Sequence, residues 1–235
     1  MDDHLKRLWR HRGATLPTPR RGPKQQLDLD EILAAAITLA DASGLEAVST
    51  RAVAARFGKT AMALYPYVGT KENLLALMQD QASAMPAPPA PPDHLAGALT
   101  GWATALYEVY LAHPWLTERP WSQASQGPNE QDWMEALLAI FERFAVPPGS
   151  RPPAVTMLYA TVRATAQTAA AYSRLTAADL ETWRDRAAAM PDSYPLSAAL
   201  TPITPHWRDA PRAGLLAAVA LLTAGLEAGP GQQRS

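Results

Sequence analysis

The sequence predicts an all-α protein in two parts, a small N-terminal helix-turn-helix unit and a larger helical domain behind it. Apolar residues recur at spacings of three and four in every strong pattern, and no segment shows the alternation of a strand. A proline-rich run at 86–92 separates the two parts. The 235 residues, 48% of them hydrophobic, suffice for one large or two small domains.

Residues 1–27 are predicted to form a flexible basic arm. They carry seven Lys or Arg against two Asp, a balance of +5, and show little apolar periodicity. Residues 28–85 and 86–235 each carry −3, so the net charge of −1 hides a concentrated positive segment. A merely solvated tail is the alternative interpretation.

A first long helix is predicted from Asp28 to Gly44. Asp28, with Glu31 three residues later, forms a capping-box-like start. Leu29, Ile32 and other apolar residues then follow one face as far as Gly44, which is a natural C-terminal stop.

Two short helices follow and complete the helix-turn-helix unit, 28–85. Ser49 caps the first of them, and a tight turn containing Gly58 leads to the second, around 62–68. Thr70 caps a fourth helix that ties this unit to the rest of the chain.

The run at 86–92 is predicted to be a polyproline II spacer roughly 20 Å long, at about 3.1 Å per residue. Residues 93–235 then form a helical domain. Its helices are expected at 93–112, 129–145, 151–174, 176–190 and 209–228.

The stretch from Leu27 to Met78 contains three pieces in order, LDLDEILAAAITLADASGLEAVSTRAVAARFG, LYPYV and GTKENLL. This stretch resembles the DNA-binding domain of the TetR/AcrR family. The resemblance implies a transcriptional regulator, most simply a repressor, whose partner is a double-stranded DNA operator.

The resemblance implies DNA contacts by the start of each short helix and of the fourth. Thr50, Arg51, Tyr65 and Lys71 would contact phosphates, which favour the free N–H groups and positive dipole of a helix N-terminus. Tyr65 packing inside the unit is the alternative. Arg20, Arg21 or Lys24 of the basic arm would reach the adjacent minor groove.

Base reading would fall to the start and exposed face of the third helix, at Lys59, Thr60, Ala61, Met62 and Tyr67. Lys59 suits guanine acceptors, while Ala61 and Met62 suit thymine methyl groups. A core position is equally open for Met62.

Two residues depart from the family pattern. Lys59 stands where the family usually has a small apolar residue packed in the turn, so it must snorkel or displace the packing. Pro66 lies inside the expected recognition helix and would shorten or kink it.

The C-terminal domain is expected to bind a ligand and to dimerise. By the resemblance, the helices at 151–174 and 209–228 form the homodimer interface, with an ordinary internal core as the alternative. A pocket for a bulky, largely apolar effector would use Trp133, Phe141, Tyr159, Arg163 and Gln167. Effector binding would shift the dimer away from the half-site spacing.

Other classes of protein find little support. Five scattered His and no Cys give no metal-ligand spacing, no phosphate-cradling glycine loop or nucleophile elbow stands out, and no cofactor is expected. No apolar run is long enough for a confident membrane span, so a cytoplasmic protein is expected. The alternatives are a drug- or metabolite-sequestering protein with a degenerate reading head, and an activator.

Overall fold

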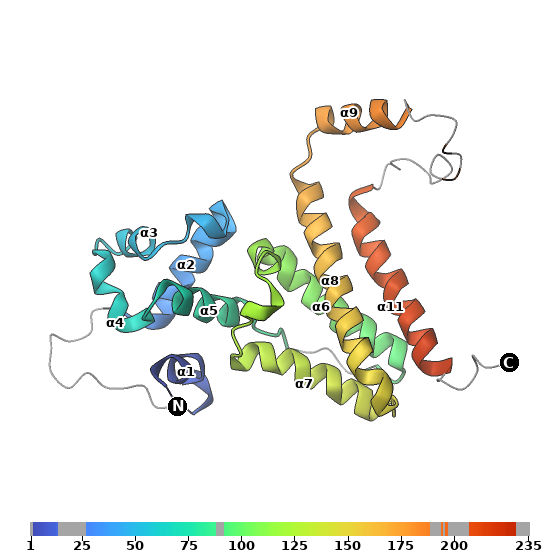
Figure 1. The fold of residues 1–235 in the computed structure, drawn as a ribbon, viewed down its shortest axis with the longest axis horizontal. Coiled ribbons are helices and arrows are strands. Elements are labelled where there is room, and N and C mark those ends of the chain that lie inside the picture. Colours follow the sequence, from blue (N-terminus) through green and yellow to red (C-terminus); the bar gives the residue numbers. More distant parts are fainter. Residues whose placement is uncertain are drawn as a thin grey trace.

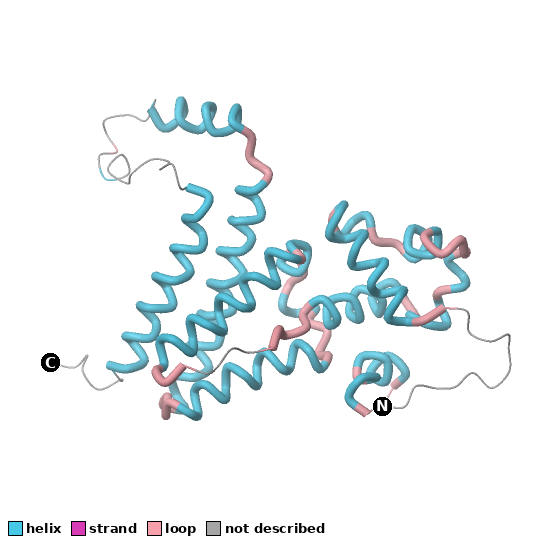
Figure 2. The backbone as a smooth tube through the Cα atoms, turned by 180° about the vertical axis from the view of Figure 1, so that it is seen from behind, coloured by secondary structure: helices cyan, strands magenta, loops and turns pink. Residues whose placement is uncertain are grey.

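The structure is a computed structural model that describes residues 2–13, 27–87, 92–188, 194, 196 and 207–228. Every regular element in these ranges is a helix, which confirms the all-α prediction (Figure 1). An N-terminal unit, α2 to α5, lies at one end of the molecule. The long helices α6, α7, α8 and α11 form the C-terminal domain at the other (Figure 2).

The N-terminal unit begins and ends its helices at the predicted caps. The Asp28 carboxylate accepts N–H bonds from Asp30 and Glu31 at 2.7 and 3.3 Å. The hydroxyls of Ser49 and Thr70 accept at 3.1 Å each. The elements are α2 (Leu29–Ser43), α3 (Thr50–Ala55), a 3-10 turn (Ala61–Ala63), α4 (Tyr65–Val68) and α5 (Lys71–Ala82).

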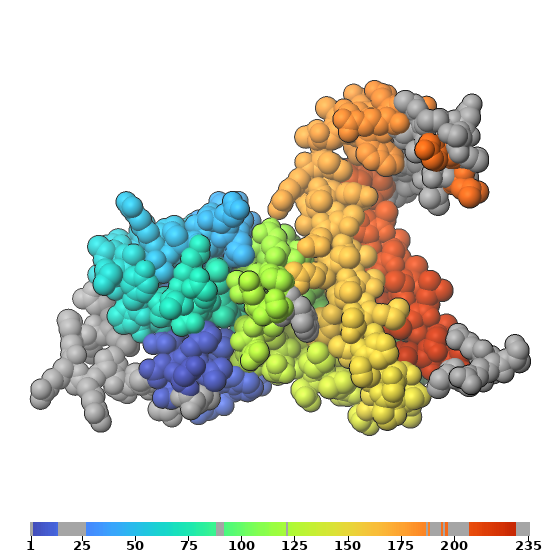
Figure 3. Space-filling view, in the orientation of Figure 1, coloured from blue at the N-terminus to red at the C-terminus, as the bar shows by residue number. Residues whose placement is uncertain are grey.

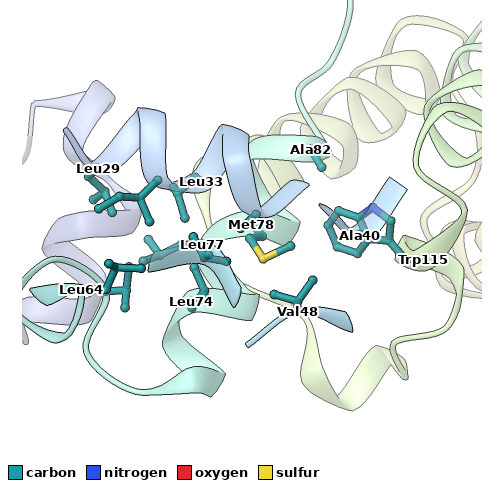
Figure 4. Packing of buried hydrophobic residues seen from close by; sticks show 14 of the residues in the cluster. Leu29, Leu33, Ala40, Val48, Leu64, Leu74, Leu77, Met78, Ala82 and Trp115 are labelled. Carbon is teal, nitrogen blue, oxygen red and sulfur yellow. The ribbon is translucent and has the colours of Figure 1, made fainter. Parts of the chain in front are cut away.

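Apolar side chains from all four helices meet in one core (Figure 4). Leu33, Leu64 and Leu77 are completely buried there. Trp115, which belongs to the C-terminal domain, inserts its ring into the same core, so the two parts share an apolar boundary. That boundary fixes the orientation of α5 against the domain behind it.

The C-terminal domain is a bundle in which α6, α8 and α11 pack together and α7 closes one side. Its core includes Leu99, Leu137, Leu158 and Leu215. The helices are α6 (Leu95–Ala112), α7 (Pro128–Arg143), α8 (Arg151–Ser173), α9 (Ala177–Ala188) and α11 (Ala210–Ala228), each starting and ending within two residues of its expected range. In Figure 3, α9 projects away from the rest of the bundle.

The prediction of an irregular basic arm is wrong for its first part. Residues Asp3–Leu8 form α1 and Arg10–Arg12 a 3-10 turn. Leu8 is only 2% exposed in the N-terminal core. The segment holds because Leu5, Leu8 and Trp9 present one small apolar face, a spacing too short to stand out in the sequence.

Side chains of this segment also bind both parts of the molecule. The Arg10 guanidinium bonds Asp30 and donates to Gln81 at 2.9 Å, while Arg12 pairs with Asp132 of α7. In Figure 3 the dark blue helix accordingly lies against the N-terminal unit and beside the yellow-green start of α7. Residues 14–26, with Arg20, Arg21 and Lys24, lie outside the described residues.

The expected linker is described only at its ends. Helix α5 stops at Ala82 and α6 starts at Leu95, and described residues 84–87 and 92–94 between them are not helical. Residues 88–91 lie outside the described part of the chain, so the polyproline II prediction is untested.

The last helix is rich in apolar residues. The stretch Trp207–Ala228 is long and apolar enough to cross a membrane by length and composition. One face of α11, however, packs into the bundle through Leu215 and Val219, as the core helix of a globular protein does. Packing in the core therefore explains why this face of α11 is apolar.

Candidate functional site

An exposed surface follows the starts of three successive helices in the N-terminal unit. Arg51 lies at the start of α3, Tyr65 at the start of α4 and Lys71 at the start of α5; all three are exposed, Tyr65 by 43%. Thr50 is half-buried beside Arg51. Free backbone N–H groups and a positive helix end accompany these side chains, an arrangement that suits phosphate oxygens.

The residues expected to read bases lie in the turn between α3 and α4 and in the turn of 3-10 helix that follows it. Lys59 and Thr60 are exposed, Ala61 is half-buried, and Met62 is 74% exposed, so Met62 is not a core residue. Lys59 points out of the turn and does not displace the core packing. The turn itself closes through Gly58, whose φ of 63° favours glycine.

Pro66 shortens the recognition helix without breaking a hydrogen bond inside it. The segment expected as one helix over 62–68 is a 3-10 turn at Ala61–Ala63 followed by α4 at Tyr65–Val68. Pro66 therefore lies in the first turn of α4, where a missing N–H costs nothing.

Tyr67 is oriented differently from its neighbours. It is half-buried against the N-terminal core, and its hydroxyl accepts a long bond from the backbone N–H of Leu27, at 3.4 Å. The prediction of a base-reading Tyr67 therefore has less geometric support than those for Lys59 and Met62.

A cavity of about 270 Å³ lies between the two parts of the molecule; we call it the interhelical cavity. Five elements contribute to its walls, including the end of α5. The lining residues are Gln79 and Ser83, Leu106 and Tyr110, Leu116, Arg119, Pro120, Ala124 and Gln126, Glu130, Gln131, Trp133 and Met134, and Tyr159 and Arg163.

Three of the five predicted ligand residues, Trp133, Tyr159 and Arg163, line this cavity. The other two predicted residues do not line it. Phe141 is fully buried in the bundle core, and Gln167, exposed on α8, donates to the Thr117 carbonyl at 2.8 Å. Phe141 lies seven residues beyond Met134, the last cavity residue of α7. Gln167 lies four residues, just over one helical turn, beyond Arg163, the last cavity residue of α8.

The interhelical cavity is more polar than the sequence suggested. Arg119 Nε donates to Gln79 Oε1 at 2.5 Å, and Gln79 in turn donates to Glu130. Burial raises the pKa of Tyr110 to about 12 and also raises the pKa of Tyr159, so both phenols stay protonated. The cavity thus offers aromatic walls together with hydrogen-bonding groups and half-buried arginines.

Sequence reasoning missed Gln79, which interrupts the otherwise apolar face of α5, and it missed Asp80 beside it. Asp80 is only 3% exposed. Its carboxylate accepts the backbone N–H groups of Asn129 and Glu130 at 3.0 and 3.3 Å, so a side chain of α5 caps α7. Gly127 leaves the room for this contact, since a Cβ there would lie 2.2 Å from the carboxylate.

Further contacts fasten the two parts around the cavity. Trp133 Nε1 donates to the Ser83 carbonyl, just after α5, at 2.7 Å. Asp41 of α2 accepts from Trp115 Nε1 at 2.7 Å and lies 2.8 Å from His113 Nδ1. The N-terminal unit is therefore held by α5 and α2 to the elements that line the cavity.

Metal binding finds no support in the described part of the chain, where no three His, Asp or Glu side chains are grouped closely enough to hold an ion.

Comparison with known proteins gives a match to the family model described as bacterial regulatory proteins, tetR family, over residues 32–78. These residues run from the first helix of the N-terminal unit to α5. They include the whole helix-turn-helix and the residues of the exposed surface described above.

One curated relative is the HTH-type transcriptional repressor DrrR1 of Streptomyces coeruleorubidus, 40% identical over 129 residues. The match covers 52% of this chain and spans about half, 46%, of that repressor's length.

Among solved structures, apo ActR of Streptomyces coelicolor is 25% identical, with a TM-score of 0.72 over 86% of this chain and 98% of that one. ActR in complex with actinorhodin is 22% identical, with a TM-score of 0.74 over 90% of this chain and 100% of that one. The chain therefore has the fold of a TetR-family regulator in both of its parts.

Proposed function

We propose that this chain, whose N-terminal domain belongs to the TetR family, is a cytoplasmic transcriptional repressor that binds a palindromic operator as a dimer and is released by a small molecule. One observation carries the proposal: Arg51, Tyr65 and Lys71 are exposed at the starts of three successive helices, beside the exposed Lys59, Thr60 and Met62. Phosphate contacts fix the register and the adjacent side chains read bases. The similarity to a transcriptional repressor supports repression rather than activation.

Dimerisation is supported by apolar side chains left outside the bundle. Met157 on α8 is 53% exposed, and Leu216 and Leu221 on α11 are 38% and 76% exposed. Other residues of the same helices, Leu158 and Leu215 among them, form the core. Pairing these faces in a two-fold dimer buries them and presents two reading heads. Such a dimer fits a palindromic operator whose two half-sites lie about one helical turn, roughly 34–36 Å, apart.

The interhelical cavity is the effector site in this proposal. Its aromatic walls suit a flat ring system, while Arg119, Tyr110 and Gln79 suit oxygen atoms on that ring. The effector is therefore an aromatic molecule with polar substituents, more polar than the sequence alone indicated. The structure of ActR with actinorhodin supports a small-molecule effector for a chain of this fold.

Release follows from where the cavity lies. Gln79 and Ser83, at the end of α5, form part of its wall, and α5 starts at Lys71, directly after the recognition helix. An effector that displaces this end of α5 changes the angle at which the reading head is held. It then favours dimers whose two heads no longer match the operator.

The test is selection of random duplex DNA on the purified full chain, at one stated salt concentration. Wild type should enrich a palindrome. Arg51→Ala should weaken binding to it and reduce the salt slope by about one per lost phosphate contact. Arg56→Ala is the matched control, because it removes an exposed arginine from the end of the same helix.

Equal losses in both arginine variants would contradict the assigned surface. If no sequence is enriched at any salt concentration while small molecules still bind, the repressor proposal fails and a sequestering protein is favoured.

A further inference from the structure

A second cavity lies on the other side of Trp133. This apolar chamber, of about 220 Å³, lies between α6, α7 and the chain just after α5; its walls include Met85, Pro86, Ala98, Gly101, Ala136 and Ile140. Trp133 lines both cavities. Each is smaller than the roughly 300 Å³ at which pockets for drug-sized ligands begin, whereas together they exceed it.

The chamber exists because small residues face one another across α6 and α7. Ala98 and Gly101 stand on one wall and Ala136 on the other, so no long side chain fills the space. A Cβ built on Gly101 meets no heavy atom within 4 Å. Gly101 is exposed, so the chamber opens to the surface at this wall, and its mostly apolar lining can take up an apolar ring.

Three aromatic rings form the partition between the cavities. Trp102 packs edge to face against Trp133, with ring centroids 5.9 Å apart, and against Tyr159 at 5.0 Å. Tyr159 lines the interhelical cavity and Trp102 lines the chamber, while Trp133 lies between the two spaces.

The two indoles are anchored differently. Trp102 Nε1 donates to the backbone carbonyl of Trp133 at 3.0 Å, so that bond survives a rotation of the Trp133 side chain. Trp133 Nε1 donates to the carbonyl of Ser83, at the end of α5. Moving the Trp133 ring therefore breaks a bond between the C-terminal domain and the helix that carries the reading head.

We propose that the two cavities are compartments of one effector site, and that Trp133 is the partition an elongated aromatic ligand displaces. The polar end of the ligand lies against Arg119 and Tyr110, and its apolar end enters the chamber. A short ligand fills the first compartment and leaves the Trp133–Ser83 bond intact, whereas a long one breaks it. This inference rests on the proposed effector role of the interhelical cavity.

Two probes separate the compartments: naphthalene-1-sulfonate, with one ring system, and 1-anilinonaphthalene-8-sulfonate, with a second ring attached. Their affinities for the full chain are measured by calorimetry, without DNA. Ala136→Leu and Gly101→Leu fill the chamber from opposite walls, so misfolding of one variant leaves the other. Ala139→Leu is the matched control, because it adds the same atoms to an exposed position of α7.

Both filled variants should lose at least tenfold in affinity for the anilino probe and keep their affinity for the short one, and the control should keep both. Trp133→Phe, which retains a ring but no donor, should bind the long probe about fivefold tighter, since no bond to Ser83 must be broken.

Each other outcome has a definite reading. Unchanged binding of the long probe in the filled variants, or equal losses for both probes, overturns the two-compartment site alone. If neither probe binds the wild type, the effector role of the interhelical cavity is contradicted together with the inference. Because no step uses DNA, failure of operator binding in the selection experiment remains a separate result.

Discussion

The two cores of this molecule are built from similar apolar side chains but are filled to different degrees. In the N-terminal unit, residues such as Ile32, Leu33 and Leu77 are completely buried around α5. The C-terminal domain, by contrast, borders two cavities that Trp133 lines, one at its boundary with the N-terminal unit and one beside α6 and α7.

The difference matches what each part must do. A reading head needs one fixed arrangement of helix N-termini, and dense packing with three side-chain caps supplies it. An effector site needs space and a movable wall, so the helices around Trp133 are less densely packed. The contacts of Asp80 and Trp133 join the rigid part to the adaptable one.

The largest effect is expected in the filled core. Leu8→Ala removes a side chain that is 2% exposed, and should lower the free energy of unfolding by about 2–5 kcal/mol, measured by denaturant titration. Lys6→Ala, which removes a half-buried lysine of α1 that pairs with Asp3, should stay within about 0.5 kcal/mol of wild type. Equal, small effects would show that the segment is an arm after all.

A substitution at the boundary between the two parts should lower the free energy of unfolding by a smaller amount. Asp80→Ala leaves the N–H groups of Asn129 and Glu130 without their acceptor and should cost about 1–3 kcal/mol in thermal or denaturant unfolding. Asp80→Asn keeps one acceptor oxygen and should cost less. A loss as large in Asp80→Asn as in Asp80→Ala would contradict the capping role.

Asp80 should also give stability a specific pH dependence. Burial raises the pKa of Asp80 to about 6, against about 3.9 for an unfolded aspartate. Between these values the folded chain binds more protons than the unfolded chain, so the free energy of unfolding should fall as the pH rises from about 4 to about 6. In Asp80→Asn this part of the slope should disappear.

The smallest effect, of opposite sign, is expected at the chamber. Gly101→Ala places a methyl group in open space within α6 and should raise the free energy of unfolding by about 1 kcal/mol, through helix propensity. Gly97→Ala on the same helix should gain nothing, because its Cβ would lie 2.9 Å from the His94 ring and from Pro92. Equal increases in the free energy of unfolding for both variants would contradict the proposed difference in free space around Gly101 and Gly97.

The sequence by itself determined the helices and their order. Asp28, Ser49 and Thr70 act on N–H groups two or three residues away, and the apolar spacing of three and four repeats within each helix. Such signals are local, and for that reason most helix bounds could be predicted from them, whereas α1 and the division of 61–68 into two elements could not. The DNA-contact residues were implied by the family resemblance.

Only the tertiary structure decided which side chains meet. Asp80 and Asn129 are 49 residues apart in the sequence, and Gln79 and Arg119 are 40 residues apart. No local sequence pattern therefore predicts either contact. For the same reason Phe141 was predicted in the pocket and lies in the core, while Leu8 was assigned to an arm and is buried. A cavity is a property of several helices packed together, and its walls are fixed only when they pack.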